Sequence, residues 1–498
     1  MRFVKLTAAS ALGALYVRPA TAAVPDPPAL EPIKVVELPM PQVTTGSCTP
    51  DINTRGTGCI SHGMYGKGFQ SGSFLPDGRH IVAYVTFTGA PEAPDPANLW
   101  KCVICGVPAQ NSLGKSDTWD YPHAFQDGRR LLAGTNIVDC GNFSLTDADY
   151  TPERTFIYPI RWNVTPDGSG AGGAIREVRI HPDDVHLGFS SFGIADGAIS
   201  QFGYFSRLQF NPSPTTGEPL VARYDLVNVT RLYSPDNTPP WTVNGDRMLR
   251  GFSGRGGEVS FIGYSTESCN VDLYAAELAT GSVRRLTAHL EYADPPYLID
   301  RYGDRGDYFG QKINEAGSGV AGSGAINDPE WNGRADPGWS PDGTKIAYWQ
   351  DMTASPACGV PGGRFVRFML ATLTSREPYT LPKADPVSDV VPWGTPCVPG
   401  DTTPRLPRIA QGTCTLLGTA SGSANVTIKD SADDSASIKS VAVQYSGYSE
   451  AVEAYSTKKT SADGFHLSVD AFINTFEANG TLTTTVDDSV YLQPLNYS

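Results

Sequence analysis

A short motif recurs along this 498-residue chain and limits the folds that it can adopt. Each copy begins with an aromatic or apolar residue, passes through a turn that usually contains Asp-Gly, and ends in an alternating strand. The clear copies are 74–84, 125–133 and 339–349, and degenerate copies lie at 180–189 and 252–261. Pro-Asp-Gly forms tight turns because proline fixes φ, aspartate bonds the backbone and glycine accepts a positive φ. The motif therefore predicts repeated β-hairpins.

The spacing of these turns indicates a repeat architecture. The aspartate or its equivalent falls at positions 77, 127, 183, 255 and 342, which are 50, 56, 72 and 87 residues apart. A further strand and a small turn can follow, as in 272–278, Thr280-Gly281 and then 283–287. This unit resembles the blade of TolB-type β-propellers, and repeats of roughly 40–50 residues are typical of propellers. The sequence predicts an all-β fold: a TolB-like six- or seven-bladed β-propeller over 55–385, with a closing strand within 33–43.

Composition agrees with many short strands joined by turns. The chain has 52 glycines and 40 prolines, and only 18% of its residues are charged. Its formal net charge is −14 and it has no basic stripe. A nucleic-acid partner is therefore excluded, because phosphate backbones are bound by clustered positive charge.

The chain divides into five predicted segments. Residues 1–23 read as a signal peptide, because Arg2 and Lys5 precede a moderately apolar stretch and a small-residue cleavage site. An N-terminal arm (24–54) leads to the propeller (55–385), and a proline-rich linker (386–412) leads to a small β-sandwich-like C-terminal domain (413–498). No later run approaches the ~18 apolar residues of a membrane span. We expect a secreted, extracellular monomer that binds no membrane.

Asparagine and cysteine usage agrees with secretion. Six Asn-x-Ser/Thr sequons, typical of an N-glycosylated exoprotein, lie at Asn142, Asn163, Asn228, Asn425, Asn479 and Asn496. In an oxidising compartment the nine cysteines are expected to form up to four disulfides and leave one thiol. We expect Cys48 to pair with Cys59 and Cys102 with Cys105. A zinc site is not expected, because no second Cys-x-x-Cys stands at a suitable spacing.

Common cofactor and hydrolase motifs do not fit this chain. The Gly-x-Gly-x-x-Gly matches at 168–173 and 317–322 do not stand between a strand and a helix, so no dinucleotide site is expected. Neither Gly-x-Ser-x-Gly nor His-Glu-x-x-His occurs. We expect no cofactor and no metal ion.

The long segment 298–337 is the strongest candidate for a catalytic loop. Glycosidic cleavage needs a carboxyl acid, a second carboxylate and an aromatic platform for the sugar. Arginine can bind a substrate carboxylate through a bidentate fork. The candidate catalytic residues are Glu330, Asp307, Asp328 and Asp304; the candidate substrate-binding residues are Arg301, Arg305, Trp331 and Tyr308. The alternative is that these carboxylates cap turns or form a calcium or salt-bridge network at the rim.

Two histidines form a second candidate constellation. His62 and His123 each lie near the start of a predicted blade, where propellers present side chains to the channel mouth. Either could bind substrate or act as a general base or metal ligand. The alternative is a structural hydrogen bond between neighbouring blades. His80, His181 and His186 fall within the repeats and are expected to be structural.

Five blocks of the sequence resemble the secreted fungal saponin hydrolases. They are 48–60, 69–74, 100–108, 297–310 and 476–484, so the likeness runs over most of the mature chain. The resemblance implies a glycoside hydrolase that cleaves the glucuronide bond between the sugar chain and the triterpene aglycone of saponins. It assigns no acid or base, so the site residues above are inferred from the loop. Members of the family have about one more blade of sequence between 287–295 and 296–300, which abut here.

Three hypotheses remain open from the sequence. The first is a saponin hydrolase, whose partner is a small triterpenoid glycoside. The second is a propeller lyase that abstracts a proton from C5 of a uronate, with His123 or His62 as the base. The third is a non-catalytic, TolB-like propeller that binds a glycoside without turnover.

Overall fold

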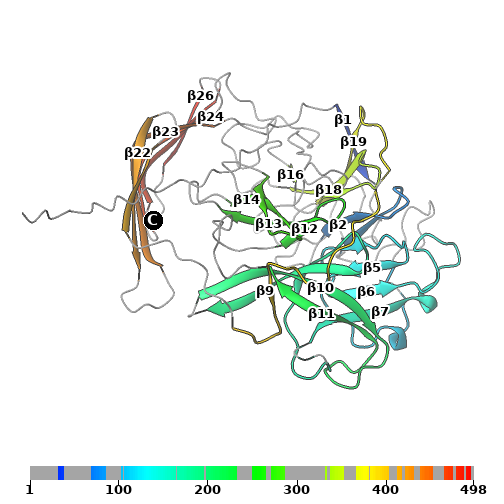
Figure 1. The fold of residues 1–498 in the computed structure, drawn as a ribbon. Helices are drawn as coiled ribbons and strands as arrows, with labels where there is room; N and C mark the ends of the chain where they lie inside the picture. Colours follow the sequence, from blue (N-terminus) through cyan, green and yellow to red (C-terminus); the bar gives the residue numbers. More distant parts are fainter. Residues whose placement is uncertain are drawn as a thin grey trace, which may run out of the picture.

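The protein is described by a computed structural model that is almost entirely β-structure (Figure 1). Within the described residues two short 3₁₀ helices, η1 (Ala109–Asn111) and η2 (Pro152–Arg154), accompany 26 strands. The all-β prediction is confirmed. None of the described helices has the length and hydrophobicity needed to span a bilayer. The described residues are 32–38, 69–85, 103–104, 106–163, 165, 167–195, 198–232, 249–264, 271–286, 331–333, 337–352, 366–380, 382–402, 412–417, 421–430, 438–452, 465–474, 478–486 and 489–494.

Three consecutive segments form four-stranded antiparallel meanders, which we call blades B, C and D, and the last strands of blades B and C also pair with each other in parallel, from Tyr224 opposite Ile160 to Leu226 opposite Trp162. Blade B contains β4 (His123–Ala124), β5 (Arg130–Ala133), β6 (Asn136–Asp139) and β7 (Phe156–Trp162). Blade C contains β8 (Arg176–Ile180), β9 (His186–Ala195), β10 (Ala198–Asn211) and β11 (Arg223–Arg231). Blade D contains β12 (Leu249–Phe252), β13 (Glu258–Tyr264), β14 (Val271–Glu277) and β15 (Val283–Arg285).

A strand of the N-terminal arm and the last part of the repeat region meet in a sheet that we call blade E. Its strands are β16 (Trp331–Gly333), β17 (Gly338–Trp339), β18 (Lys345–Met352), β19 (Val366–Leu373) and β1 (Ile33–Leu38). Strand β1 pairs antiparallel with β19, from Ile33 opposite Leu373 to Leu38 opposite Phe368. The predicted closing strand is therefore confirmed. Blade A, which contains β2 (Phe69–Phe74) and β3 (Ile81–Val85), contacts β17 and β18 on one side and β4 on the other.

The five predicted repeat copies fold into the same hairpin turn. In the first, the backbone N–H of Leu75 donates to His80 O and that of Gly78 donates back to Leu75 O. The same pair of hydrogen bonds starts at Phe125, His181, Ser253 and Ser340. The fourth residue of each turn has a positive φ, between 62° and 83°: Gly78, Gly128, Asp184, Gly256 and Gly343. Glycine suits this position because it has no Cβ.

Neighbouring turns also contact one another. The Asp184 carboxylate accepts hydrogen bonds from the backbone N–H groups of Gln126 (2.8 Å) and Asp127 (3.0 Å), which links blade C to blade B. The His181 Nε2 donates to Gly256 O (2.9 Å), which links blade C to blade D. Repeated meanders whose innermost strands and turns meet around one axis define a β-propeller. The predicted number of blades stays a prediction, because 287–330 lies outside the described residues.

Apolar side chains fill the spaces between the blades. Trp162 on β7 packs edge-on against Phe189 and close to Tyr204, and all three rings are buried. A second cluster joins Phe205 of blade C to Leu249 and Phe261 of blade D. A blade on its own would expose the apolar face of its sheet. Stacking against the next blade buries this apolar area.

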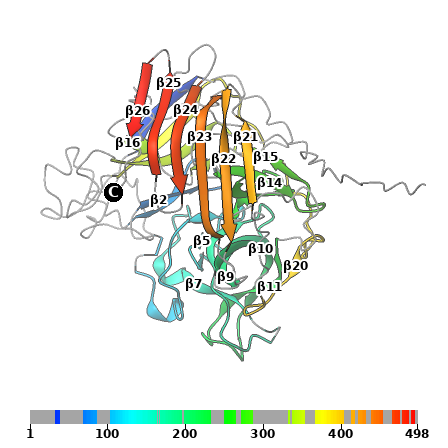
Figure 2. The ribbon, with the colours of Figure 1, turned by 90° about the vertical axis from the view of Figure 1, so that its left-hand side faces the viewer.

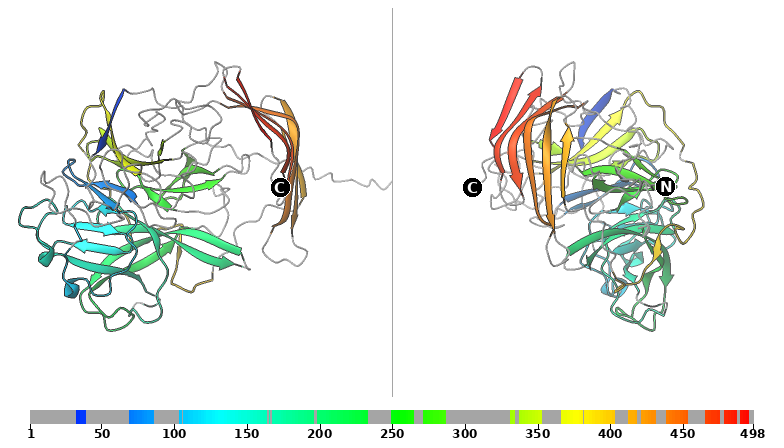
Figure 3. Two further views of the ribbon diagram at one scale, coloured as in Figure 1. Left: turned by 180° about the vertical axis from the view of Figure 1, so that it is seen from behind. Right: turned by 60° about the vertical axis from the view of Figure 1, so that its left-hand side comes forward.

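The C-terminal segment forms a separate six-stranded antiparallel meander, seen face-on in Figure 2 and from other sides in Figure 3. Its strands are β21 (Gly412–Leu417), β22 (Ser421–Asp430), β23 (Ile438–Val452), β24 (Phe465–Asn474), β25 (Ala478–Val486) and β26 (Ser489–Pro494). Of the two layers that a sandwich needs, the described residues form one.

The described part of the predicted linker packs along the propeller. Strand β20 (Thr395–Pro396) pairs with the edge of β11, and Trp393 Nε1 lies 3.1 Å from the carbonyl oxygens of Glu277 and Leu278. Val391 is buried in the cluster between blades C and D. The segment 382–402 therefore acts as a strap across these blades.

The cysteine prediction needs a correction. Cys140 and Cys397 are both buried thiols rather than halves of disulfides. The other seven cysteines can form at most three disulfides, not four. Burial raises the pKa of Cys397 despite its neighbour Arg231, which favours the thiol over the thiolate. Cys48, Cys59, Cys102 and Cys105 lie outside the described residues.

Candidate functional site

Most of the catalytic loop predicted from the sequence lies outside the described residues. This holds for Glu330, Asp307, Asp328, Asp304, Arg301, Arg305 and Tyr308. His62, the other candidate histidine, also lies outside the described residues. Trp331 begins β16, whose backbone pairs with β18. His123 begins β4, opposite Leu132, and is partly buried. The sequence indicated that His123 stands just before a blade strand, and in the structure it is the first residue of β4; its role stays a prediction.

A cluster of charged and polar side chains lies on, or just before, the first strands of blades B, C and D, and we call it the channel cluster. It contains Asp120 and Tyr121 before β4, Arg176, Glu177 and Arg179 on β8, and Arg250 on β12. The Glu177 carboxylate bridges two arginines, with Oε1 2.7 Å from Arg176 and Oε2 3.3 Å from Arg250. Glu177, Arg179 and Arg250 are all buried. None of the sequence motifs indicated this cluster.

Arg179 ties the cluster to blade B. Its guanidinium carbon lies 4.1 Å from the centroid of the Tyr121 ring, a cation–π contact. Its Nε donates to Arg250 O at 3.0 Å. Three blades therefore hold these guanidinium groups in fixed positions.

Two residues of the channel cluster have an unusual backbone. Tyr121 and Glu177 have φ values of 50° and 51°, and each stands four residues before the first residue of its blade's turn. Around Glu177 the pairing of β8 with β9 shifts register between Arg176 and Arg179, which is a β-bulge. A positive φ in a residue other than glycine costs about 1–3 kcal/mol and recurs at functional sites. Bulges re-aim side chains, and here Glu177 reaches arginines on two blades.

The two carboxyl groups of the channel cluster have different surroundings. Burial raises the pKa of Asp120, and the charge of Glu177 adds to this effect. Glu177 is ion-paired on both oxygens. Guanidinium groups in fixed positions can bind a carboxylate, and two carboxyls in unlike environments can divide acid and base roles.

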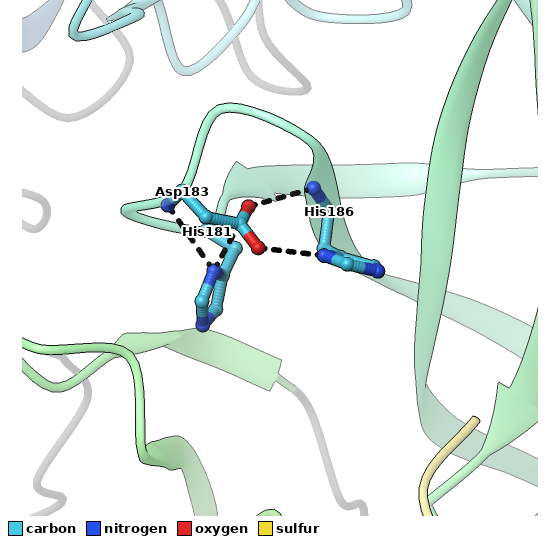
Figure 4. A group of neighbouring side chains, drawn as sticks. All are labelled: His181, Asp183 and His186. Atoms are coloured by element: carbon cyan, nitrogen blue, oxygen red, sulfur yellow. Dashed lines mark hydrogen bonds and ion pairs between the residues drawn. The ribbon is translucent and has the colours of Figure 1, made fainter. Parts of the chain in front are cut away.

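A second cluster, His181, Asp183 and His186, surrounds the turn of blade C (Figure 4). One ligand atom from each residue lies within 4.8 Å of the others, so the group could hold a metal ion. Hydrogen bonds already account for this spacing. His186 donates from Nδ1 to Asp183 Oδ2 (2.7 Å) and from Nε2 to Asp389 Oδ1 (2.9 Å), while His181 Nε2 donates to Gly256 O. The geometry favours a structural role, as the sequence indicated.

The hydrogen bonds of His186 make it a buried cation. Ionised carboxylates only accept hydrogen bonds, so both ring nitrogens must carry protons. Burial lowers the pKa of His186, but the bonds with Asp183 and Asp389 outweigh burial and raise it above 6.5. Burial likewise raises the pKa of Asp183, but the two imidazoles and backbone N–H groups outweigh it and hold the pKa far below 3.8. Arg207 also contacts Asp389, at 2.9 Å. Because Asp389 belongs to the strap, this network fastens the strap to blade C.

This network predicts a pH-dependent stability. A histidine with a raised folded pKa stabilises the fold fully below its unfolded value near 6.5 and loses that contribution as pH rises through the folded pKa. The loss in unfolding free energy caused by His186→Gln is therefore expected to be largest at pH 6 and smaller at pH 9. Urea unfolding at several pH values measures it. His80→Gln is the matched control, because His80 holds the same place in blade A with 60% of its side chain exposed. An equal loss at every pH would contradict the charged state of His186.

The glycine-rich match at 168–173 has a structural explanation. The carbonyl oxygens of Gly168 and Gly170 accept hydrogen bonds from Arg161, and those of Thr216, Gly217 and Pro219 accept from Arg223. A phosphate-binding loop instead presents backbone N–H groups to an anion. The prediction that this motif binds no dinucleotide agrees with this arrangement.

Comparisons with known proteins concern the fold alone. No family model matches the chain, and no curated protein matches it. Among solved structures, the chain is similar to a protein assigned as TolB from Agrobacterium tumefaciens, with a TM-score of 0.20, 11% identity, and coverage of 75% of this chain and 79% of that chain. It is also similar to the β-propeller domain of the Trilobed protease from Pyrococcus furiosus, with a TM-score of 0.16, 8% identity, and coverage of 66% and 86%. The fold is a β-propeller. That assignment rests on the strand pairing and the five equivalent turns described above.

Proposed function

We propose that this protein is a secreted glycoside hydrolase that cleaves the glucuronide bond between the sugar chain and the triterpene aglycone of saponins. The proposal rests on the five sequence blocks that resemble the secreted fungal saponin hydrolases, which extend from 48–60 to 476–484. The channel cluster supports it, because a uronate carboxylate needs cationic donors and Arg176, Arg179 and Arg250 are gathered beside two carboxyl groups. Its partner is a small glycoside, and we propose that it acts as a monomer.

The decisive experiment is incubation of the purified full-length protein with a soyasaponin, followed by mass spectrometry of the products. Addition of water predicts a free aglycone and an intact oligosaccharide that ends in glucuronic acid. Absence of turnover by a well-folded sample would overturn the proposal and leave a glycoside-binding propeller.

Carboxylates of the 298–337 loop are the proposed acid and base. Removing a general acid or base typically lowers the rate by roughly 10²–10⁴-fold. We therefore expect Glu330→Gln and Asp307→Asn each to reduce soyasaponin turnover within that range, with Asp328 and Asp304 next in order. Glu153→Gln, at an exposed position in η2, is the control and should retain full activity. Full activity of both loop variants would show that the acid and base lie elsewhere.

A uronate lyase is the second candidate, and the position of His123 favours it. His123 stands on β4, two residues after Tyr121, whose ring contacts Arg179. A lyase needs a base near C5 and an arginine that neutralises the uronate carboxylate. Its product would contain a double bond and absorb ultraviolet light, and it would be lighter by one water than the hydrolysis product. The same mass spectra therefore distinguish the two reactions.

A further inference from the structure

Arg176, Phe192 and Gln201 lie on one face of the blade C sheet, toward the end where β9 turns into β10. Phe192 on β9 and Gln201 on β10 are directly opposite each other. Arg176 on β8 is opposite Ser190, two residues before Phe192 on the same strand. Residues that are paired across strands, or two apart along a strand, share a face. Strands β9 and β10 stay paired as far as Ala195 and Ala198, beyond the last pair of β8 with β9 at Arg176 and Ser190. Their hairpin points toward the side where the C-terminal sheet lies (Figures 1 and 3).

Arg176 is the most exposed of the three arginines in the channel cluster, because Arg179 and Arg250 are buried. Its side chain is 36% exposed, and its guanidinium carbon lies 4.6 Å from the centroid of the Phe192 ring, which is itself 54% exposed. Glu177 Oε1 accepts from one terminal nitrogen (2.7 Å) and Gln201 Oε1 lies 3.4 Å from the other. A guanidinium has five N–H donors, so these two bonds orient Arg176 and leave donors for a ligand.

Gln201 adds an independent observation that points to a missing acceptor. Only 1% of its surface is exposed, and its Oε1 faces Arg176. Its Nε2 has no hydrogen-bond partner among the described residues. Buried amide donors are nearly always satisfied, because leaving one unpaired is unfavourable. A partly exposed guanidinium and a buried, unsatisfied amide thus lie side by side.

We propose that Arg176 and Gln201 bind the carboxylate of a uronic acid, with Phe192 packed against the apolar face of the sugar ring. A carboxylate is the ligand group that matches these donors. Arg176 can donate to its two oxygens, and Gln201 Nε2 can add a hydrogen bond to one of them. Glu177 disfavours a doubly charged phosphate at this position, because like charges repel. That the carboxylate belongs to a sugar rests on the proposed function.

The test measures binding without hydrolysis. Sodium glucuronate is titrated into the purified full-length protein and followed by calorimetry or ligand-observed NMR, with glucose as the matched neutral sugar. We expect glucuronate to bind at least about tenfold more tightly than glucose, since charge-assisted hydrogen bonds are the stronger kind. Equal binding of the two sugars, no binding of glucuronate, or equally tight binding of inorganic phosphate would overturn the proposal.

Variants locate the site. Arg176→Gln is expected to weaken glucuronate binding by about tenfold or more, and Phe192→Ala and Gln201→Met by a smaller factor. Arg129→Gln removes an exposed arginine from the turn of blade B and should leave binding unchanged. Thermal unfolding of each variant confirms that it is folded, and Phe192→Ala, at an exposed position, covers the case in which a buried variant does not fold. Wild-type affinity in both Arg176→Gln and Phe192→Ala would place the sugar elsewhere.

This outcome is separable from that of the proposed function. Glucuronate bound through Arg176 in a protein that leaves saponins intact would support the binding site and overturn the hydrolase. Saponin hydrolysis together with glucuronate binding that Arg176→Gln leaves unchanged would support the hydrolase and overturn the binding site.

Discussion

Replacing Gly256 by alanine is expected to lower the free energy of unfolding by about 3–5 kcal/mol. Gly256 has a φ of 83°, a conformation that disfavours any side chain. A Cβ at this position would lie 2.1 Å from His181 Nε2 and 2.4 Å from His181 Cε1. His181 is buried and bonded to Gly256 O, so it cannot move aside without breaking the link between blades C and D. Urea or thermal unfolding of the purified variant measures the effect.

The adjacent residue provides the control. Gly257 has no positive φ, and a Cβ there would meet nothing within 4 Å. Gly257→Ala should therefore change stability by less than about 1 kcal/mol, in either direction. Equal destabilisation by the two variants would mean that the turns of neighbouring blades do not support each other as described.

Arg223→Met is also expected to lower the free energy of unfolding by about 3–5 kcal/mol. Arg223 is fully buried, and its Nε donates to Asp225 Oδ1 at 2.7 Å. Its terminal nitrogens donate to the carbonyl oxygens of Thr216 and Pro219, both at 3.0 Å. Methionine fills part of the volume but removes the charge that balances the buried Asp225 and leaves Asp225 Oδ1 and these carbonyls without a donor, while Asn211 Nδ2 still donates to Asp225 Oδ2 at 2.8 Å. The loss is measured by urea unfolding at neutral pH.

Two comparisons separate the buried charge from the loss of packing. Arg207→Met removes an arginine that is 43% exposed and pairs with Asp389, which is also partly exposed. This variant should lower the free energy of unfolding by less than about 1 kcal/mol. The double variant Arg223→Met with Asp225→Leu removes both charges and should recover part of the loss. No recovery would mean that the carbonyl contacts, rather than the ion pair, determine the stability of this region.

The sequence predicted the repeated parts of the fold well, because each turn is determined locally. Asp77, Asp127 and Asp342 accept backbone N–H groups within their own turns, as expected for Asp-Gly hairpins. Even the degenerate copy at 180–189 folds in the same way, with Asp184 at the position of glycine. The closing strand was predictable because an isolated β-rich segment needs a partner.

The channel cluster could not be predicted, because its members come from three blades and share no local motif. Tyr121 and Glu177 hold equivalent positions with the same backbone conformation, yet their side chains have nothing in common. The strap was missed for a similar reason: Asp389 meets His186 across 203 positions of sequence. Only Arg176 and Arg179, close together on one strand, offered a signal, and a pair of arginines is too common to indicate a site.

Because β1 pairs with β19, blade E can form only after the last part of the repeat region has been synthesised. Ile33 and Leu373 are partners although 340 residues separate them. Synthesis at about 5–20 residues per second leaves the first strand without its partner for roughly 20–70 s. An open strand edge is a template for pairing with other chains. During each round of translation the N-terminal strand must therefore be shielded until the last blade emerges to receive it.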